Sequence, residues 1–215
     1  MKEYKLDAEA KILLDKGFVL PVMEEFYSIH GEGLHTGKAA YFIRIGGCDV
    51  GCNWCDVKES WNPNHFPPTN VDEVLERVFQ NISKTVLITG GEPLNFNLNY
   101  LCEKLGEKGF SRHIETSGSS PLSGEWDWIC LSPKRNKNPL AEIYPKANEL
   151  KVIIEKQDDF LWALENSKLV SEDCELYVQP EWSVSTKIMS DVVEFVKDNP
   201  KWKVSIQSQK YMRVP

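Results

Sequence analysis

The sequence predicts an α/β fold built on a mostly parallel sheet. Short runs of β-branched and aromatic residues alternate with amphipathic helix patterns, and this alternation is typical of parallel strands joined by helices. Polar corners containing glycine follow several of these runs, and in such folds ligands bind at the carboxyl ends of the strands. We expect every one of these corners, including the one after residue 29, to lie at such an end. The length of 215 residues suits one domain with a substantial core.

The first half of the chain carries clear start and stop signals for helices. Asp7 is expected to cap a helix that ends at Gly17, and Asn70 is expected to cap a helix with Val74 and Val78 on its apolar face. Gly109 ends a third helix. The predicted helices of this half are residues 6–16, 71–81 and 98–108, and its predicted strands are residues 25–29, 39–45 and 86–89.

The second half continues the alternation of strands and helices. Its last helix places Ile188, Val192 and Val196 on one apolar face at a spacing of four residues. The predicted strands are residues 110–115, 128–131, 150–154, 176–179 and 202–207, and the predicted helices are residues 159–169 and 186–198.

Composition and charge exclude several classes of function. The formal charge of −7 argues against binding to a nucleic-acid backbone, which requires clustered Lys and Arg. No uncharged stretch approaches the length of a membrane span, and the N-terminus lacks an apolar secretion segment. The six cysteines, with half of them in one loop, do not resemble a disulfide framework. We therefore expect a cytoplasmic protein that acts on a small molecule, without nucleic-acid or membrane partners.

Three cysteines, Cys48, Cys52 and Cys55, form the chemically richest stretch of the chain. Soft thiolates select zinc, copper(I) or iron–sulfur clusters. A cubane cluster held by three cysteines leaves one iron without a protein ligand and therefore open to a small molecule. Two alternatives to a cluster are a zinc knuckle completed by His65 and thiols that bind no metal.

Three further positions suggest ligand contacts. His30-Gly31-Glu32-Gly33 and Gly90-Gly91-Glu92-Pro93 each place a carboxylate beside glycines, which let a ligand approach the backbone. Glu92 suits a cationic amine. Arg44 is the single charge in an apolar strand pattern and suits an anion. Each of these also has an ordinary reading, as a surface turn, a capped strand-to-helix turn or an exposed strand charge.

The cysteine spacing, with an aromatic residue before the last cysteine, resembles the signature loop of the radical S-adenosylmethionine (SAM) superfamily. Within it, the chain resembles the 7-carboxy-7-deazaguanine synthase family. The short chain, without an auxiliary cysteine cluster, agrees with that family. The matching stretches are residues 26–33, 39–61, 87–94, 115–118, 131–134, 179–180 and the C-terminal region ending in Pro215.

The resemblance implies a fold and a reaction. The fold is a modified, incomplete (β/α) barrel in residues 23–215, preceded by an N-terminal helical extension in residues 1–22. The reaction is a radical ring contraction of 6-carboxy-5,6,7,8-tetrahydropterin to 7-carboxy-7-deazaguanine with loss of ammonia, in the pathway to queuosine and other deazapurines. SAM would be regenerated in each turnover. No side chain is expected to act as a catalytic acid or base, because the cluster and SAM generate the radical.

The resemblance also implies a role for particular residues. A [4Fe–4S] cluster would be held by Cys48, Cys52 and Cys55. SAM would contact Trp54, Asp56, Gly91, Glu92, Glu115, Ser117, Ser132, Pro133, Lys134 and Gln179. The pterin would contact Ile29, His30, Gly31, Glu32, Arg44, Thr89 and the terminal carboxylate of Pro215.

Two positions depart from the family pattern. The family more often has Gln where this chain has His30, and it tends to have a hydroxyl residue that contacts Mg²⁺ where this chain has Val57. A magnesium ion would then need other ligands, with Asp56 or Ser60 as candidates. An electron donor such as flavodoxin or ferredoxin and a homodimeric state are also expected. The alternatives to this function are an activase of a glycyl radical enzyme, which acts on a protein, and a non-catalytic zinc or iron–sulfur binding module.

Overall fold

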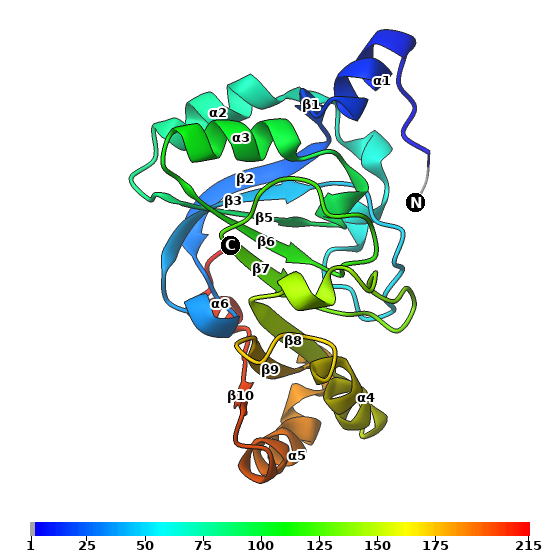
Figure 1. The fold of residues 1–215 in the computed structure, drawn as a ribbon, viewed down its shortest axis with the longest axis vertical. Coiled ribbons are helices and arrows are strands. Elements are labelled where there is room, and N and C mark those ends of the chain that lie inside the picture. Colours follow the sequence, from blue (N-terminus) through cyan, green and yellow to red (C-terminus); the bar gives the residue numbers. More distant parts are fainter. Residues whose placement is uncertain (1–2) are drawn as a thin grey trace.

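One curved sheet of eight strands organises the molecule (Figure 1). The computed structural model describes residues 3–215. Across the sheet the strand order is β10-β9-β8-β7-β6-β5-β3-β2, and all neighbours from β3 to β10 are parallel. The strands are β2 (Val22–Ile29), β3 (Ala39–Ile45), β5 (Thr85–Gly90), β6 (Ser111–Thr116), β7 (Trp128–Leu131), β8 (Glu149–Ile154), β9 (Glu175–Pro180) and β10 (Trp202–Val204).

Helices lie beside both ends of this sheet. Figure 1 shows α2 and α3 beside the β2–β3–β5 end of the sheet, and α4 and α5 beside the β8–β10 end. The bounds are α1 (Ala8–Asp15), α2 (Val71–Phe79), α3 (Asn99–Glu107), α4 (Asp158–Ser167), α5 (Ser185–Asp198) and α6 (Ser208–Met212). This arrangement agrees with the predicted α/β fold, a mostly parallel sheet that forms an incomplete barrel. Within residues 3–215, no helix combines the length and apolar character needed to cross a membrane.

One face of the sheet packs in the core and the other lines a cavity, because side chains alternate between the two faces along a strand. Ile43 and Ile88 are fully buried in the main core under the helices. Their neighbours Phe42 and Leu87 belong to a small second cluster on the opposite face, and Arg44 lies on that face too. The second face lines a cavity, so the alternation separates the core from the site.

The predicted caps are present. The Asp7 side chain accepts a hydrogen bond from the Ala10 N–H, and the Asn70 side chain accepts one from the Asp72 N–H. These bonds satisfy N–H groups that the first helical turn leaves without backbone partners. Residues 39–45 and 128–131 form strands with the predicted bounds, and the other predicted elements differ at their ends by one to three residues.

The sequence missed a small sheet, and the last strand is shorter than predicted. β1 (Val19–Leu20) pairs antiparallel with β4 (Thr69–Asn70), and α6 occupies part of the C-terminal region where no helix was expected. Leu20 is only 1% exposed in the main core, so the N-terminal segment packs on the rest of the fold. The division at residue 23 stays a prediction.

One topological inference from the sequence was wrong. β2 is antiparallel to β3, with Ile29 opposite Ala39, so the corner after β2 lies beside the amino-terminal end of β3 and not beside the carboxyl ends of the parallel strands. The connection between β2 and β3 is too short for the crossover that parallel pairing needs.

This corner nevertheless reaches the far end of the sheet. The Gly33 N–H donates to the Ser205 hydroxyl at 3.0 Å, and the Leu34 N–H donates to the Glu149 carboxylate at 3.1 Å. Gly33 has φ +59°, and a Cβ there would lie 1.9 Å from Glu149 Oε1, so glycine is strongly favoured. The segment thus spans from β2 to β8 and β10 and closes one side of the open barrel.

Candidate functional site

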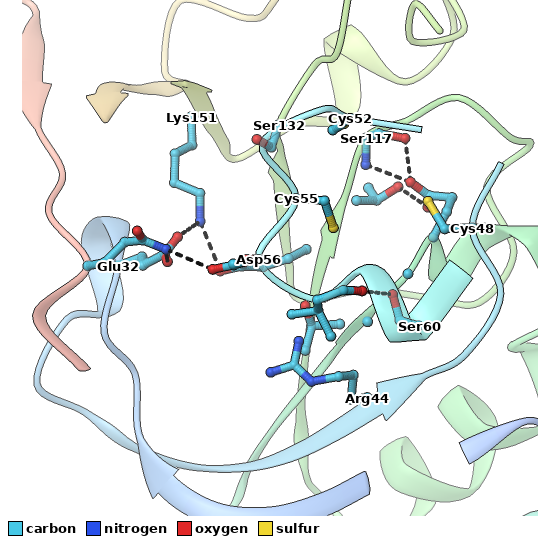
Figure 2. A pocket seen from close by; sticks show the side chains of 18 of the residues that line it. Glu32, Arg44, Cys48, Cys52, Cys55, Asp56, Ser60, Ser117, Ser132 and Lys151 are labelled. Atoms are coloured by element: carbon cyan, nitrogen blue, oxygen red, sulfur yellow. Dashed lines mark hydrogen bonds and ion pairs between the residues drawn. The ribbon is translucent and has the colours of Figure 1, made fainter. Parts of the chain in front are cut away.

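The predicted site residues converge on one cavity of about 270 Å³ (Figure 2). Every one of them except Pro133 lines it. They come from the cysteine loop, from the ends of β5, β6 and β7, from the closing segment after β2, and from the C-terminus. Residues that are scattered over nearly the whole sequence therefore share one chamber.

Backbone contacts hold the cysteine loop against the short helical turn Lys58–Trp61. The Gly47 N–H donates to the Ser60 carbonyl at 2.6 Å, and the Cys48 N–H donates to the Trp61 carbonyl at 3.3 Å. The Trp61 indole N–H donates to the Cys55 sulfur at 3.4 Å. Both ends of the loop are thus tied to this one turn.

Two of the three thiols lie in surroundings that disfavour their charged form. Burial raises the pKa of Cys48 and of Cys52 above the ordinary value. A bound metal centre would favour the thiolate, because metal ligation deprotonates cysteine. The Cys55 thiol lines the same cavity.

His65, the fourth ligand of the alternative zinc knuckle, lies outside the cavity that the three cysteines line. Within residues 3–215, no three or more Cys, His, Asp and Glu side chains are grouped so as to hold one metal ion. The exposed His65 does not line the cavity, and its Nε2 lies 2.8 Å from the Asn62 side-chain amide. A cubane cluster places each cysteine on a different iron, so its ligands need not meet at one point. The zinc knuckle with His65 is therefore not supported.

The segment after β7 also contacts the cysteine loop, through two side chains. The Asn136 side-chain amide donates to the Gly51 carbonyl at 2.7 Å, and Lys137 pairs with Asp49 at 2.8 Å. The Lys134 ammonium donates to the Ser132 carbonyl at 2.6 Å and lies 5.7 Å from the centre of the Trp54 ring. The predicted SAM residues of the two segments are therefore in contact.

Glu92 ties the corner after β5 to the corner after β6. The side chain is buried, and its carboxylate accepts hydrogen bonds from Thr116 Oγ1 at 2.5 Å, from the Ser117 N–H at 2.8 Å and from the Ser117 hydroxyl. It also accepts from the Leu94 N–H at 3.1 Å. The carboxylate thus already has protein donors on both oxygens, and its contact with an amine stays a prediction.

Gly91 brings this corner against the cysteine loop. A Cβ at Gly91 would lie 2.5 Å from the Gly47 carbonyl oxygen, which is closer than real Cβ atoms come. The Gly91 N–H donates to the Ile45 carbonyl at 2.8 Å, and the Glu92 N–H donates to the Gly47 carbonyl at 2.9 Å. Glycine is required here because two backbones touch.

A buried ion-pair network, which the sequence analysis missed, lies beside these corners. Lys151 on β8 places its ammonium 2.6 Å from Glu32 and 3.1 Å from Glu115, and in Figure 2 its side chain points toward Glu32. Burial alone would lower the pKa of Lys151, but the surrounding anionic groups, Glu115 and Glu32 among them, raise it well above its usual value. Lys151 could have been found from the sequence, because it is a single charge in an apolar strand pattern, as Arg44 is.

Glu32 is the most heavily bonded carboxylate of the network. Besides Lys151, it accepts from Gln207 at 3.1 Å, from Gln209 at 2.9 Å and from Gln179 at 3.2 Å. Burial opposes its charge, but Lys151 and the glutamine amides lower its pKa to about 2. Gln207 and Gln209 had not been predicted, because their partner lies far away in the sequence.

His30 lies between the two carboxylates of the network. Its Nδ1 accepts from the Glu32 N–H at 3.3 Å, and its Nε2 lies 3.6 Å from Glu115. Burial lowers the pKa of His30, although Glu115 acts in the opposite direction. The ring is therefore neutral near pH 7, with its proton on Nε2 toward Glu115.

Arg44 and the C-terminus meet the cavity from the β2–β3 side. The Arg44 Nε donates to the Glu24 carboxylate at 2.6 Å, and the guanidinium lines the cavity. The Pro215 carboxyl group also lines it, with one oxygen accepting from the Ser28 hydroxyl at 3.2 Å. A guanidinium fixed at one nitrogen keeps its planar fork available to an anion.

Comparison with known proteins gives a clear relationship. Residues 42–131 match the family model described as the radical SAM superfamily. The chain is 51% identical to the 7-carboxy-7-deazaguanine synthase of Flavobacterium psychrophilum, over 98% of this chain and 100% of that protein. The chain belongs to the 7-carboxy-7-deazaguanine synthase family. The enzyme of that name from Synechocystis is 45% identical over 90% of this chain and 93% of its own length.

A solved structure agrees with this family. The crystal structure of QueE from Escherichia coli superposes with a TM-score of 0.80 and 27% identity, and the match covers 94% of this chain and 100% of that chain. As a radical SAM enzyme of this family, the chain uses a [4Fe–4S] cluster and SAM as cofactors. The glycyl-radical activase and the non-catalytic binding module are set aside by this relationship.

Position 57 supplies no side-chain ligand for magnesium in this chain. Val57 offers no side-chain oxygen, and its carbonyl accepts from the Ser60 hydroxyl at 2.6 Å. Asp56 is exposed and lies 3.3 Å from the Lys210 ammonium. Of the two candidates for supplying an oxygen ligand, Asp56 is thus held from the C-terminal side, and Ser60 is already bonded within its own loop.

Proposed function

We propose that this protein catalyses the ring contraction of 6-carboxy-5,6,7,8-tetrahydropterin to 7-carboxy-7-deazaguanine with loss of ammonia, in the biosynthesis of queuosine and related deazapurines. The observation that carries the proposal is that the cysteine loop, the polar strand ends and Pro215 line one and the same cavity. The 51% identity to a named 7-carboxy-7-deazaguanine synthase over nearly the whole chain supports it.

In this proposal Cys48, Cys52 and Cys55 hold the cluster. When bound, the cluster and SAM supply the 5′-deoxyadenosyl radical that abstracts a hydrogen atom from the substrate. The chain holds SAM with residues of the cysteine loop and residues at or just after the ends of the strands. These are Trp54, Asp56, Gly91, Glu92, Glu115, Ser117, Ser132, Pro133, Lys134 and Gln179. Glu92 contributes mainly by fixing Thr116 and Ser117 in place.

The pterin occupies the part of the cavity between the closing segment and the C-terminus. Arg44 binds the substrate carboxylate with its guanidinium fork. The neutral His30 offers a ring proton, and Ile29, Gly31, Glu32, Thr89 and Pro215 complete the binding surface. Polar groups placed at fixed points of a pocket are what orient a small ligand.

The protein also needs partners and conditions that suit this chemistry. A one-electron donor protein such as a flavodoxin or ferredoxin reduces the cluster, the chain assembles as a homodimer, and the enzyme works in the cytoplasm. Mg²⁺ assists the substrate through oxygen ligands that Val57 does not supply. Light scattering coupled to gel filtration measures the oligomeric state directly.

The decisive experiment is turnover. Anaerobically reconstituted protein, reduced with dithionite, is incubated with SAM and the carboxytetrahydropterin, and the products are identified by mass spectrometry. We expect 7-carboxy-7-deazaguanine, with SAM regenerated. Omitting SAM and substituting a pterin without the carboxylate are the matched controls. Formation of 5′-deoxyadenosine without any deazapurine would contradict the proposed substrate.

A further inference from the structure

Trp61 contacts both ends of the cysteine loop. Its carbonyl accepts from the Cys48 N–H at 3.3 Å, and its indole N–H donates to the Cys55 sulfur at 3.4 Å. It is the last residue of the turn Lys58–Trp61, whose Ser60 is fully buried and binds the Gly47 N–H. These backbone bonds hold the Trp61 backbone beside the cysteine loop, within reach of the Cys55 sulfur.

We propose that Trp61 is a positioning residue that holds Cys55 and raises the reduction potential of the cluster through the indole N–H. This inference rests on the proposed role of Cys55 as a cluster ligand. Hydrogen bonds to ligating sulfurs are one of the levers that set the potentials of iron–sulfur clusters. A donor directed at a sulfur stabilises negative charge, and the reduced cluster carries one more electron than the oxidised one. The bond therefore favours reduction.

The donor to Cys55 belongs to the Trp61 side chain, so a substitution can remove it. The Cys48 sulfur is approached by the backbone N–H groups of Val50 and Gly51, which no substitution of a side chain removes. Trp54 offers a matched comparison, because it lies in the same loop and lines the same cavity. The centre of its ring lies 5.7 Å from the Lys134 ammonium, whereas the Trp61 indole donates to the Cys55 sulfur.

The first test is a redox titration of the reconstituted holoenzyme, without SAM, followed by the electron paramagnetic resonance signal of the reduced cluster. We expect Trp61→Phe to shift the midpoint potential to a more negative value at unchanged iron content. Trp54→Phe is expected to keep the wild-type potential. Equal potentials for wild type and Trp61→Phe, or equal shifts in both variants, would overturn the inference, because the latter would indicate a general effect of solvent access.

A second measurement covers the case in which Trp61→Phe fails to retain a cluster. Wild-type holoenzyme is prepared with ¹⁵N-indole tryptophan and reduced, and pulsed electron paramagnetic resonance is used to detect coupling between the cluster and a ¹⁵N nucleus. We expect a coupling that persists in Trp54→Phe. Its absence in the wild type would overturn the inference alone. A wild type that takes up no [4Fe–4S] cluster would overturn the proposed function as well, so the two failures are distinguishable.

Discussion

The Lys151 ammonium lies 2.6 Å from the Glu32 carboxylate, although the two residues are 119 positions apart in the sequence. The same ammonium lies 3.1 Å from Glu115. One buried cation thus joins the closing segment, where the pterin is proposed to bind, to the end of β6, where SAM is proposed to bind. The side chains of all three residues are mostly buried, so the charges are only weakly screened by solvent.

Removing this cation is expected to destabilise the protein strongly. Lys151→Met leaves Glu32 and Glu115 without their shared counter-ion, and breaking a buried pair in this way costs about 3–5 kcal/mol. Urea unfolding of both proteins near neutral pH measures the loss. Lys197→Met, which breaks the exposed pair with Glu194, is the matched control and is expected to leave the unfolding midpoint unchanged. Equal midpoints for Lys151→Met and wild type would show that the buried pair contributes nothing.

The cysteine loop is expected to be essential for turnover but not for folding. Cys48→Ala removes one of only three proposed cluster anchors, so iron content and product formation should both be lost. Far-ultraviolet circular dichroism should show a folded protein, because the loop lines the cavity outside the main core. Cys102→Ser, on the buried face of α3, should keep the cluster at a cost of about 1–3 kcal/mol. Substantial turnover by Cys48→Ala would rule out the radical mechanism.

Arg44 is expected to act on substrate affinity and not on SAM affinity. Arg44→Lys keeps the charge but loses the planar fork, so the Michaelis constant for the pterin should rise by roughly ten-fold or more, about 1.4 kcal/mol. The dissociation constant of SAM, measured by calorimetry, should stay the same. Arg77→Lys serves as the control, because Arg77 pairs with Glu25 and does not line the cavity. Equal weakening for both ligands would make Arg44 a structural residue.

The residue at position 57 is expected to set the magnesium dependence. Mg²⁺ prefers six oxygen ligands, and the valine side chain offers none. Val57→Thr is nearly isosteric and adds a hydroxyl, so half-maximal activity should occur at a lower magnesium concentration than in the wild type. Val57→Ala changes size without adding oxygen and should leave the curve unaltered. Superimposable titrations for the wild type and Val57→Thr, with a tight requirement, would mean that another residue supplies the ligand.

Two packed histidines are expected to make the fold sensitive to mild acid. The rings of His35 and His113 lie 4.5 Å apart, and burial, together with neighbouring cationic groups, lowers the pKa of each to about 4. Between the ordinary histidine value of about 6.5 and that of the folded state, the unfolded chain binds more protons, so stability falls as the pH falls. Each histidine contributes a slope of at most about 1.4 kcal/mol per pH unit.

Urea unfolding at about pH 7 and at about pH 5 measures this slope. His113→Gln should reduce the loss of stability on acidification, because it removes one of the two groups that must remain neutral in the fold. His65→Gln, at an exposed position, should leave the slope as it is in the wild type. A slope unaffected by His113→Gln would place the acid sensitivity elsewhere.

The sequence by itself determined the features that depend on neighbouring residues. The strand over residues 39–45 follows from a β-branched and aromatic run, and the helix beginning at Val71 follows from the Asn70 cap and the spacing of its valines. The cysteine spacing and the glycine-containing corners likewise predicted where the site lies, because each motif is complete within a few residues. The periodicity of strands and helices depends only on neighbouring residues, so it can be recognised without knowing the fold.

Only the tertiary structure decided which distant groups meet. The antiparallel direction of β2 depends on a hairpin connection, and it carries Glu32 across the barrel to Lys151, a contact that no local pattern encodes. The bond from the Trp61 indole to Cys55 depends in the same way on how the loop folds back on itself. Burial turns these contacts into pKa shifts and ion pairs, and burial is a property of the assembled sheet and not of any one segment.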